Sequence, residues 1–473
     1  MMEYDLFGIK DIVYDSRKAA PGTAFVCLVG AKSDGHNFAR MAYDKGTRLF
    51  FAQRELSLPD DAKVIITEDT RITLAELSRQ FFDYPDTKLK IIGITGTKGK
   101  TTTSNIIAQI LNKSGKNAAV IGTNGIIING VRTPTVNTTP ESYELYKSFN
   151  DMVNAGCDHC VMEVSSQAVK LNRIHGIEFH IGVFTNLSPD HIGEGEHKDY
   201  DEYRTCKAGL FSRSKVSVIN CDDDDASYMI KAASGKIITY SVKEGDCCAY
   251  DIKRWSEAGA LGVKFNCRYN DVTTELKIAT PGIYSVYNAL CAYTVCLQCG
   301  VTSAQIIKYL PTTRVKGRFE IVDALTDATV IIDYAHNGLS LESVLKTIKE
   351  YEPQRLVVLF GSVGERTQLR RRELAEVARE YADLAIVTSD NPGNEDPDKI
   401  IDEICSYLGD TPCVRFADRV EAVEYAVMNA KAGDVILLAG KGHEDYQLIG
   451  SEKVPFSEYD IVVNTAQKTR AIV

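Results

Sequence analysis

Short apolar runs recur along the chain, and most of them end in glycine or polar residues. The clearest run covers residues 91–95 and breaks into Gly96-Thr97-Lys98-Gly99-Lys100-Thr101. Apolar residues at helical spacing follow at 106–111, and Ser114-Gly115 stops that pattern. A run of this kind indicates a buried strand, and the spacing after it indicates an amphipathic helix. The sequence therefore predicts a strand, a glycine-rich loop and a helix in succession.

Other apolar runs predict further strands that alternate with helical patterns. The predicted strands lie at 23–28, 62–66, 161–166, 183–187, 330–334, 356–360, 384–387 and 434–439. The alternation from about residue 90 to 316 predicts a doubly wound core, and the last block predicts a second parallel sheet. In such sheets the functional groups follow the carboxyl ends of the strands. We expect three domains, over residues 1–88, 89–317 and 318–473.

Composition fits a folded protein of that size. The chain has 473 residues, of which 44% are hydrophobic and 25% charged, and its net charge is −10. That charge argues against a nucleic-acid partner, because phosphate backbones attract basic surfaces. No apolar run approaches the length of a membrane span, and no signal peptide is recognisable. We expect a cytoplasmic monomer.

The glycine-rich loop has the composition of a nucleotide-phosphate cradle. Small residues let backbone N–H groups turn toward phosphates, Lys100 supplies a positive charge, and the Thr101 hydroxyl can hold Mg²⁺. Residue 94 is isoleucine where the general G-x-x-x-x-G-K-T spacing requires glycine, so the loop is a variant. We expect the chain to use ATP.

A second cluster follows in the middle of the chain. Glu163 ends an apolar run, and a buried carboxylate there needs a partner. His191 follows the next run and is a candidate ligand for the same metal, although a lone histidine is more often structural. Lys207 lies on a predicted helix; taken alone, it would be a surface lysine.

Two other features leave alternatives open. The pairs Cys157/Cys160 and Cys296/Cys299 could bind zinc, but cysteines on an apolar helix commonly behave as buried hydrophobes, which we favour. The turns Asp15-Ser16-Arg17 and Asp34-Gly35-His36 could grip a nucleotide-like ligand or merely close turns, and residue type favours neither.

An ordered set of motifs, spread over nearly the whole chain, resembles that of the Mur ligases. The motifs are Gly96-Thr97-Lys98-Gly99-Lys100-Thr101-Thr102, Met162-Glu163-Val164-Ser165-Ser166, Thr185-Asn186-Leu187-Ser188 with Asp190-His191, Tyr287-Asn288-Ala289-Leu290, Gly317-Arg318, Asp333-Tyr334-Ala335-His336 and Gly440-Lys441-Gly442-His443-Glu444. The N-terminal turns, Thr138-Thr139-Pro140 and the segment 390–397 most resemble the members that add the third residue of the peptidoglycan stem peptide.

The resemblance implies an α/β fold of three domains: a small uridine-nucleotide-binding domain, a central P-loop ATPase-like domain with a mostly parallel sheet, and a C-terminal Rossmann-like domain. It implies an ADP-forming amide ligase of peptidoglycan precursor synthesis. The partners would be UDP-N-acetylmuramoyl-L-Ala-D-Glu and a free amino acid, and ATP would phosphorylate the acceptor carboxylate. ATP and two Mg²⁺ ions would bind, and domain closure would complete the site.

The resemblance also implies roles for individual residues. ATP would contact Gly96, Thr97, Lys98, Gly99, Lys100, Thr101, Thr102, Asn288, Arg318, Asp333 and His336. Magnesium would be held by Thr101, Glu163 and His191, beside a carbamylated Lys207; the catalytic groups would be Lys100, Lys207, His191 and Glu163. The substrates would contact Ser16, His36, Thr138, Thr139, Ser166, Arg173, Asp390, Asn391, Gly393, Glu395, Gly440 and Glu444.

Departures from the family pattern guide the choice of amino acid. Gln167 replaces a usual histidine, and Gly393 stands where members that add meso-diaminopimelate carry an arginine that holds the distal carboxylate. We therefore predict L-lysine or another amino acid, with Glu395 and Glu444 available to an ammonium group. Arg366 could substitute for the missing arginine.

Alternatives remain. The nearer ones are a diaminopimelate-adding, tetrapeptide-stage or folylpolyglutamate synthetase-like ligase. The more distant one is a non-ligase P-loop ATPase or nucleotide-binding regulator.

Overall fold

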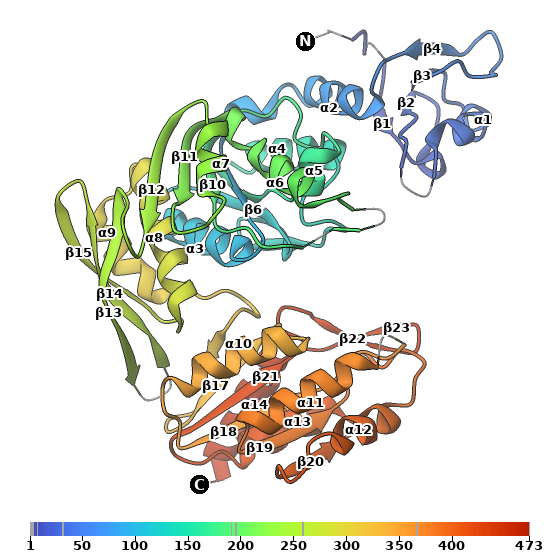
Figure 1. Cartoon of the computed structure of the whole chain (residues 1–473). Helices are drawn as coiled ribbons and strands as arrows, with labels where there is room; N and C mark the ends of the chain where they lie inside the picture. The colour runs from blue at the N-terminus through green and yellow to red at the C-terminus, as the bar shows by residue number, and fades with distance from the viewer. Residues whose placement is uncertain are drawn as a thin grey trace. The chain divides into compact units, whose positions relative to one another are not determined.

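The computed structural model describes residues 4–6, 8–30, 33–190, 192–193, 196–257, 260–365 and 368–472 (Figure 1). The chain forms two compact units. The first comprises Met1–Cys248, Arg268–Asp271 and Leu290–Ile306, and the second comprises Ala249–Cys267, Val272–Ala289 and Ile307–Val473. The predicted domain boundaries after residues 88 and 317 stay predictions.

The N-terminal part of the first unit is a four-stranded parallel sheet in the order β1-β2-β3-β4. Its elements are β1 (Asp11–Val13), β2 (Thr23–Val26), β3 (Leu49–Ala52), β4 (Lys63–Ile66), α1 (Ala39–Asp44), α2 (Thr70–Phe81) and the 3-10 turns η1 (Ser16–Lys18), η2 (Gly35–Phe38) and η3 (Pro85–Lys88). Buried Phe25 and Phe50 pack edge to face in its core. Two of the four strands were predicted. β1 has only three residues and gives no pattern, whereas β3, an apolar run as long as β2 and β4, was missed.

The rest of this unit is built on a sheet in which β12-β11-β10-β5-β9-β6 run parallel and β7 and β8 complete one edge as antiparallel strands. The strands are β5 (Lys90–Thr95), β6 (Ala118–Gly122), β7 (Gly125–Ile128), β8 (Val131–Thr133), β9 (His159–Glu163), β10 (Phe179–Phe184), β11 (Ser214–Asn220) and β12 (Lys236–Ser241). The helices are α3 (Lys100–Lys113), α4 (Ser142–Asn154), α5 (Ser166–Lys170), α6 (Tyr200–Ala208), α7 (Ala226–Ala232) and the 3-10 turn η4 (Phe211–Arg213). Strand β5 is interior, and its neighbours are β9 and β10.

The predicted alternation of strand and helix fails between residues 247 and 278. Three strands follow one another there without a helix: β13 (Cys247–Glu257), β14 (Ala260–Tyr269) and β15 (Val272–Ile278). Polar residues alternate with apolar ones through much of this segment, so it lacks the continuous apolar runs of the parallel strands. After them come α8 (Ile283–Gln298), α9 (Ser303–Tyr309) and η5 (Leu310–Thr312).

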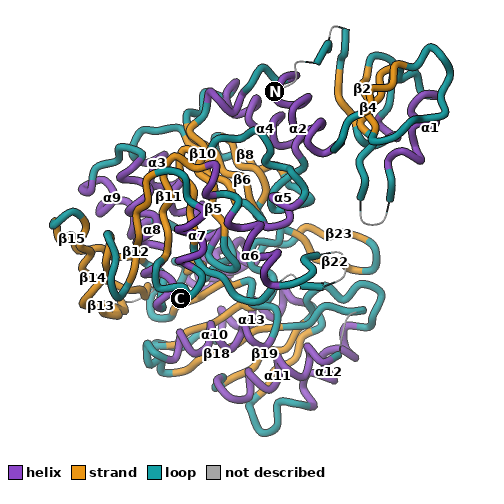
Figure 2. The backbone as a smooth tube through the Cα atoms, turned by 45° about the horizontal axis from the view of Figure 1, so that its top comes forward, coloured by secondary structure: helices purple, strands orange, loops and turns teal. Residues whose placement is uncertain are grey.

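The C-terminal sheet has the order β16-β17-β21-β18-β19-β20, parallel except for β16. Its strands are β16 (Glu320–Val322), β17 (Thr329–Asp333), β18 (Arg355–Phe360), β19 (Leu384–Thr388), β20 (Cys413–Phe416) and β21 (Asp434–Ala439), with a hairpin of β22 (Tyr446–Ile449) and β23 (Glu452–Pro455). One apolar core joins it to α10 (Gly338–Lys349), α11 (Leu369–Tyr381) and α12 (Pro397–Ser406), and another joins it to α13 (Arg419–Met428) and α14 (Glu458–Ile472). Helices therefore cover both faces, as Figure 2 also shows, and the predicted Rossmann-like layering is confirmed.

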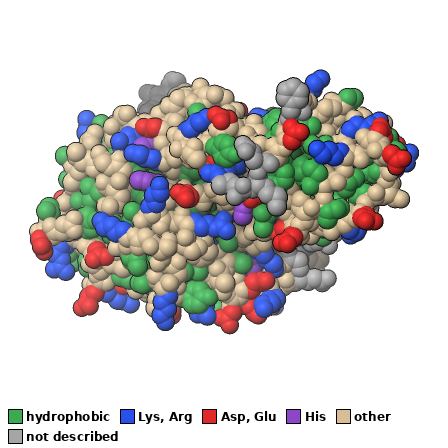
Figure 3. All heavy atoms as spheres, turned by 90° about the horizontal axis from the view of Figure 1, so that it is seen from above, with side chains coloured by type: hydrophobic (Ala, Val, Ile, Leu, Met, Phe, Trp, Pro, Cys, Tyr) green, Lys and Arg blue, Asp and Glu red, His purple; other side chains and the backbone are tan. Residues whose placement is uncertain are grey.

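On the face shown in Figure 3, positively and negatively charged side chains are interspersed. Among the described helices, none has the length and apolar character that crossing a membrane requires. All thirteen cysteines are free thiols. Cys160 and Cys296 are fully buried, and burial raises the pKa of each thiol, as expected of small core residues rather than zinc ligands.

Candidate active site

The glycine-rich loop joins β5 to α3, as the sequence predicts. Gly96 has φ +149° and Gly99, the N-cap of α3, has φ +85°. A side chain at Gly96 would not fit, since its Cβ would lie 2.0 Å from the Thr185 hydroxyl. The first backbone bond of the helix runs from the Thr103 N–H to the Gly99 carbonyl, so earlier N–H groups face the loop. This end of α3 suits an anion.

Thr185 and Asn186, which follow β10, form hydrogen bonds with the backbone of the glycine-rich loop. Asn186 accepts from the Thr97 N–H through its carbonyl (2.8 Å) and from the Lys98 N–H through its Oδ1 (2.9 Å). The Thr185 hydroxyl donates to the Lys98 carbonyl at 2.7 Å. Neighbouring strands therefore fix the shape of the loop before any phosphate arrives.

Gly96→Ala is expected to weaken ATP binding by about a hundredfold, because the methyl group must displace Thr185 or the loop. Isothermal titration with ATP would measure the change. Gly115→Ala is the matched control: Gly115 also has positive φ, but no atom lies within 4 Å of its built Cβ. An unchanged ATP affinity in Gly96→Ala would contradict this account of the loop.

Two lysines converge on one carbonyl of the loop. The Gly96 oxygen accepts from Lys100 Nζ at 2.8 Å and from Lys207 Nζ at 2.9 Å. Lys207 is only 2% exposed and lies 4.5 Å from the centroid of the Tyr203 ring. Burial, and then the charge of Lys100, lowers the pKa of Lys207 well below its usual value. The reading of Lys207 as a surface lysine is therefore wrong.

Glu163 ends β9, beside β5, and is buried. Its carboxylate accepts from the Thr123 N–H (2.9 Å) and lies 3.2 Å from the Thr123 hydroxyl. Gly122 makes room for it, because a Cβ there would lie 2.2 Å from Glu163 Oε1. Thr123 is thus the partner that burial of the carboxylate requires.

The predicted dipeptide-binding residues lie beside Glu163. Thr138 Oγ1 is 3.2 Å from the Thr123 hydroxyl, and the Thr139 hydroxyl donates to the Glu163 carbonyl at 2.9 Å. Arg173 donates to the Thr139 carbonyl (3.0 Å) and to the Glu141 carboxylate (2.6 Å). The structure therefore brings these residues to one place, although their roles stay predictions.

Ser166 contacts a histidine that the sequence analysis did not single out. Its hydroxyl lies 2.9 Å from His197 Nε2, and the His197 ring is completely buried. Burial, followed by the charge of Lys170, lowers the pKa of His197. The predicted ligand His191 lies outside the described residues, as does Arg366.

The donor set fits magnesium better than zinc. No group of three or more histidine, cysteine or acidic side chains converges among the described residues. Thr101 and Glu163 instead offer oxygen atoms at the ends of neighbouring elements. Magnesium prefers oxygen ligands, keeps several waters and shares phosphate oxygens, so it needs few protein ligands.

The second unit carries the other predicted ATP contacts. The Asp333 carboxylate accepts from the Phe319 N–H (2.7 Å) and the Ala335 N–H (2.8 Å), and burial raises its pKa. Arg318 lies 5.0 Å from the centroid of the Tyr334 ring. His336 Nδ1 lies 2.9 Å from the Tyr334 carbonyl. Asn288 belongs to α8.

A cavity of about 250 Å³ opens at the carboxyl ends of the C-terminal strands. Predicted site residues that line it are His336, Asp390, Asn391, Gly440 and Glu444. Buried Lys441 donates to Glu444 (2.6 Å) and to Asn391 Oδ1 (2.8 Å). Two cations that sequence reasoning missed, Arg370 and Lys453, also line the cavity. The cavity thus presents both signs of charge.

Gly393 and Glu395 do not line this cavity. Both line a neighbouring cavity of about 370 Å³. The Glu395 carboxylate is bound by Arg371 at 2.7 Å and accepts from the Glu365 N–H, and these bonds lower its pKa. The expected pairing of Glu395 with a substrate ammonium group is therefore not favoured by this geometry. Glu444 does line the first cavity, where Lys441 binds its carboxylate at 2.6 Å.

The two N-terminal turns are closed by their own side chains. Asp15 caps η1 and Asp34 caps η2, each accepting a backbone N–H two residues ahead. His36 Nδ1 lies 2.5 Å from Asp34, and its Nε2 accepts from the Gln53 N–H. The Ser16 hydroxyl is buried against Met41. Turn closure explains these contacts; nucleotide binding by Ser16 and His36 stays a prediction.

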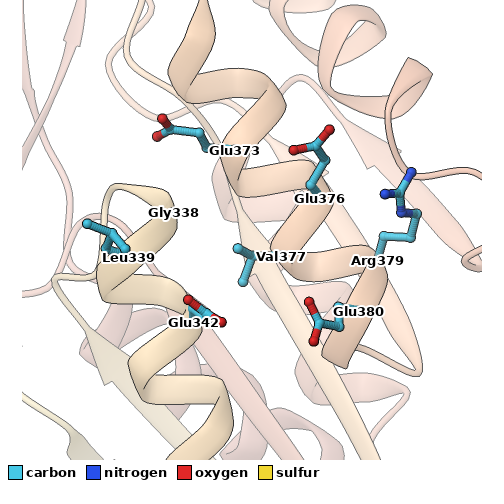
Figure 4. Close-up of a pocket in the computed structure, with 8 residues that line it drawn as sticks. All are labelled: Gly338, Leu339, Glu342, Glu373, Glu376, Val377, Arg379 and Glu380. Atoms are coloured by element: carbon cyan, nitrogen blue, oxygen red, sulfur yellow. The ribbon is translucent and has the colours of Figure 1, made fainter.

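A further hollow, of about 700 Å³, lies between α10 and α11 (Figure 4). Its lining includes Glu342, Glu373, Glu376 and Glu380. So many carboxylates would repel a phosphorylated substrate. This hollow is therefore a poor candidate for the reaction site.

Comparison with known proteins agrees with these motifs. Three family models match: "Mur ligase family, catalytic domain" over 8–82, "Mur ligase middle domain" over 94–296 and "Mur ligase, glutamate ligase domain" over 317–442. Proteins of Caldanaerobacter subterraneus subsp. tengcongensis and Clostridium perfringens are each 40% identical, over 457 and 466 residues, covering 96% of this chain and 94% of the relative. Both are named UDP-N-acetylmuramoyl-L-alanyl-D-glutamate--2,6-diaminopimelate ligase.

Two solved structures resemble this chain over nearly its whole length. One with that same enzyme name has a TM-score of 0.74 at 30% identity, covering 98% of this chain and 95% of its own. The MurF ligase of Thermotoga maritima, solved with ADP, shares the fold at a TM-score of 0.60 and 18% identity, covering 99% and 100%.

These relatives contradict the prediction that L-lysine or another non-diaminopimelate amino acid is added. The prediction relied on the missing side chain at position 393. A missing side chain at one position does not exclude diaminopimelate, because two other cations, Arg370 and Lys453, line the cavity that holds Asp390 and Glu444.

Proposed function

The chain belongs to the Mur ligase family of ATP-dependent, ADP-forming amide ligases, and we propose that it joins 2,6-diaminopimelate to UDP-N-acetylmuramoyl-L-alanyl-D-glutamate in peptidoglycan synthesis. The observation that best supports this substrate is the mixed charge of the cavity lined by Glu444, Arg370 and Lys453. Diaminopimelate carries two ammonium and two carboxylate groups, and complementary charges favour its binding.

The first chemical step would use the glycine-rich loop. The terminal phosphoryl group of ATP passes to the side-chain carboxylate of the D-glutamyl residue, and ADP leaves. Lys100 and the N–H groups at the start of α3 would stabilise the charge that develops on this group. Bound Mg²⁺, held by Thr101 and Glu163, would supply Lewis-acid chemistry to the phosphate oxygens.

The second step forms the amide. The amine of the amino acid attacks the activated carbonyl carbon, phosphate leaves, and the amine loses a proton. Thr138, Thr139 and Arg173 would orient the dipeptide, since they lie together beside Glu163. Glu444 would receive an ammonium group of the incoming amino acid. Holding the reactants in line is the main contribution of these residues.

Lys207 would carry a carbamate. Its amine is buried and its pKa is well below the usual value, so the neutral form that reacts with CO₂ is accessible. The change from cation to anion would also remove the repulsion between Lys207 and Lys100, which share the Gly96 carbonyl. An anion there could help to bind magnesium.

A carbamate on Lys207 predicts one ¹³C carbamate resonance when the protein is incubated with ¹³C-bicarbonate. The resonance should be absent from Lys207→Ala. Lys215→Ala, which removes an exposed lysine, should keep it. A spectrum of the wild-type protein without this resonance would exclude the modification.

The decisive experiment for the proposed function supplies ATP, UDP-N-acetylmuramoyl-L-Ala-D-Glu and an equimolar mixture of diaminopimelate, L-lysine and other amino acids, with products identified by mass. We expect the diaminopimelate tripeptide to dominate. A product with another amino acid, or ATP hydrolysis that needs no acceptor, would overturn the proposal. The cytoplasmic location and the monomeric state are predictions that this assay does not address.

A further inference from the structure

We propose that Lys453 is the specificity-determining residue that binds the second carboxylate of the diamino-dicarboxylic acid, in place of an arginine at position 393. The proposal rests on the proposed function. It concerns how this chain recognises diaminopimelate although an arginine side chain is missing at position 393.

Position 393 is unsuited to a long side chain. Gly393 has φ +60°, a conformation that other L-residues adopt only with strain. A Cβ there would lie 3.0 Å from the Glu365 carboxylate. The backbone at this position therefore favours glycine, which supplies no cation of its own.

The β22–β23 hairpin is the element that the Gly393 loop rests on. The Gly393 N–H donates to the Leu448 carbonyl at 3.2 Å, and the Gly450 N–H donates to the Gly393 carbonyl at 2.8 Å. Within the hairpin, Leu448 is directly opposite Lys453. These bonds place Lys453 beside the loop that contains Gly393, where the proposal locates the second carboxylate of the substrate.

Lys453 is available to a substrate anion. It lines the same cavity as Asp390 and Glu444, and its side chain is exposed. Within the described part of the chain, no carboxylate lies within ion-pair distance of its ammonium group, which stands 4.2 Å from the centroid of the Tyr446 ring. Lys441, in contrast, is buried and already neutralised by Glu444.

The placement of charges matches the two ends of the substrate. Glu444 and Asp390 share one buried cation, Lys441, which leaves one negative charge for a substrate ammonium group. Lys453 and Arg370 give each of two carboxylates a cationic partner. L-Lysine has the same two ammonium groups but only one carboxylate, so it would leave one of these two cations without an anionic partner. The arrangement therefore discriminates against L-lysine by charge.

Lys453→Gln tests the proposal because it removes the charge and keeps much of the length. We expect the KM for diaminopimelate to rise about twentyfold, with kcat within about threefold and the KM for ATP unchanged. The ratio of kcat/KM for diaminopimelate to that for L-lysine should fall at least about tenfold. Lys453→Arg should keep most of the preference for diaminopimelate.

Lys346→Gln is the matched control: this exposed lysine pairs with Glu342 on α10, outside the cavity lining, and should change neither constant. Circular dichroism would establish that each variant is folded. An unchanged KM for diaminopimelate in Lys453→Gln, or an equal loss for both amino acids, would overturn this proposal alone. A wild-type protein that makes no diaminopimelate product would overturn the proposed function, and this proposal with it.

Discussion

Replacing Lys100 with alanine is expected to slow amide formation by about a thousandfold while the chain stays folded. Lys100 is the cation at the end of the glycine-rich loop, where its Nζ donates to the carbonyls of Gly96 and Thr97. When ATP binds, the same group can turn to the transferred phosphate, whose charge grows in the transition state. The loss should therefore fall mainly on kcat.

The measurement is the rate of phosphate release that depends on both acceptors, followed with saturating substrates. Lys113→Ala is the control, because it removes a lysine from the last turn of the same helix. Its rate should stay within about twofold, since a charge at that end contributes less than about 1 kcal/mol to helix stability. If Lys100→Ala kept the wild-type rate, the assigned role of the loop would be wrong.

Arg419→Ala is expected to lower the free energy of unfolding of the C-terminal part by about 3–5 kcal/mol, because it leaves a buried carboxylate without its partner. Arg419 is fully buried and donates twice to Glu458, at 2.7 and 3.0 Å. It also donates to the carbonyls of Ser389 and Ala439, which precede two lining residues of the cavity, Asp390 and Gly440. Stability and substrate affinity should therefore fall together.

Thermal denaturation should show the transition of the C-terminal part lowered by roughly 10 °C. Arg372→Ala provides the comparison, since Arg372 forms an exposed ion pair with Glu376 within α11. Such surface pairs contribute about 0.3–0.5 kcal/mol, so its melting temperature should hardly move. An equal, small shift in both variants would mean that the buried pair is not a main support of this region.

The sequence predicted features whose requirements are local. The loop from Gly96 to Thr102 was recognised because backbone conformation, helix start and lysine position all lie within a few residues. The apolar strands β5, β17, β18, β19 and β21 were found for the same reason. The strands predicted at 161–166 and 183–187 end three residues beyond β9 and β10, and β6, β11 and β12 were not predicted. The three-residue strand β1 and the strands β13–β15, in which polar residues alternate with apolar ones, do not carry the signal of a continuous apolar run.

Features that depend on distant segments were missed. Thr123 meets Glu163 across forty positions of sequence, and His197 meets Ser166 across thirty-one. Lys453 reaches its cavity only through the pairing of β22 with β23. The amino acid that the enzyme adds was predicted wrongly because the prediction rested on Gly393 alone. It did not consider Arg370 on α11 and Lys453 on β23, which line the cavity.

The order of the central sheet has a practical consequence. The residues proposed for catalysis follow interior strands, whereas β8 lies at the rim, and Val131 on it is 71% exposed. Amide protons of such an edge should exchange with deuterium sooner than those of β5. Once the exposed and half-buried thiols of Cys206, Cys221, Cys405 and Cys413 are replaced by serine, a fluorescent dye attached through a cysteine at position 131 would therefore report on this protein at an edge remote in strand order from the glycine-rich loop.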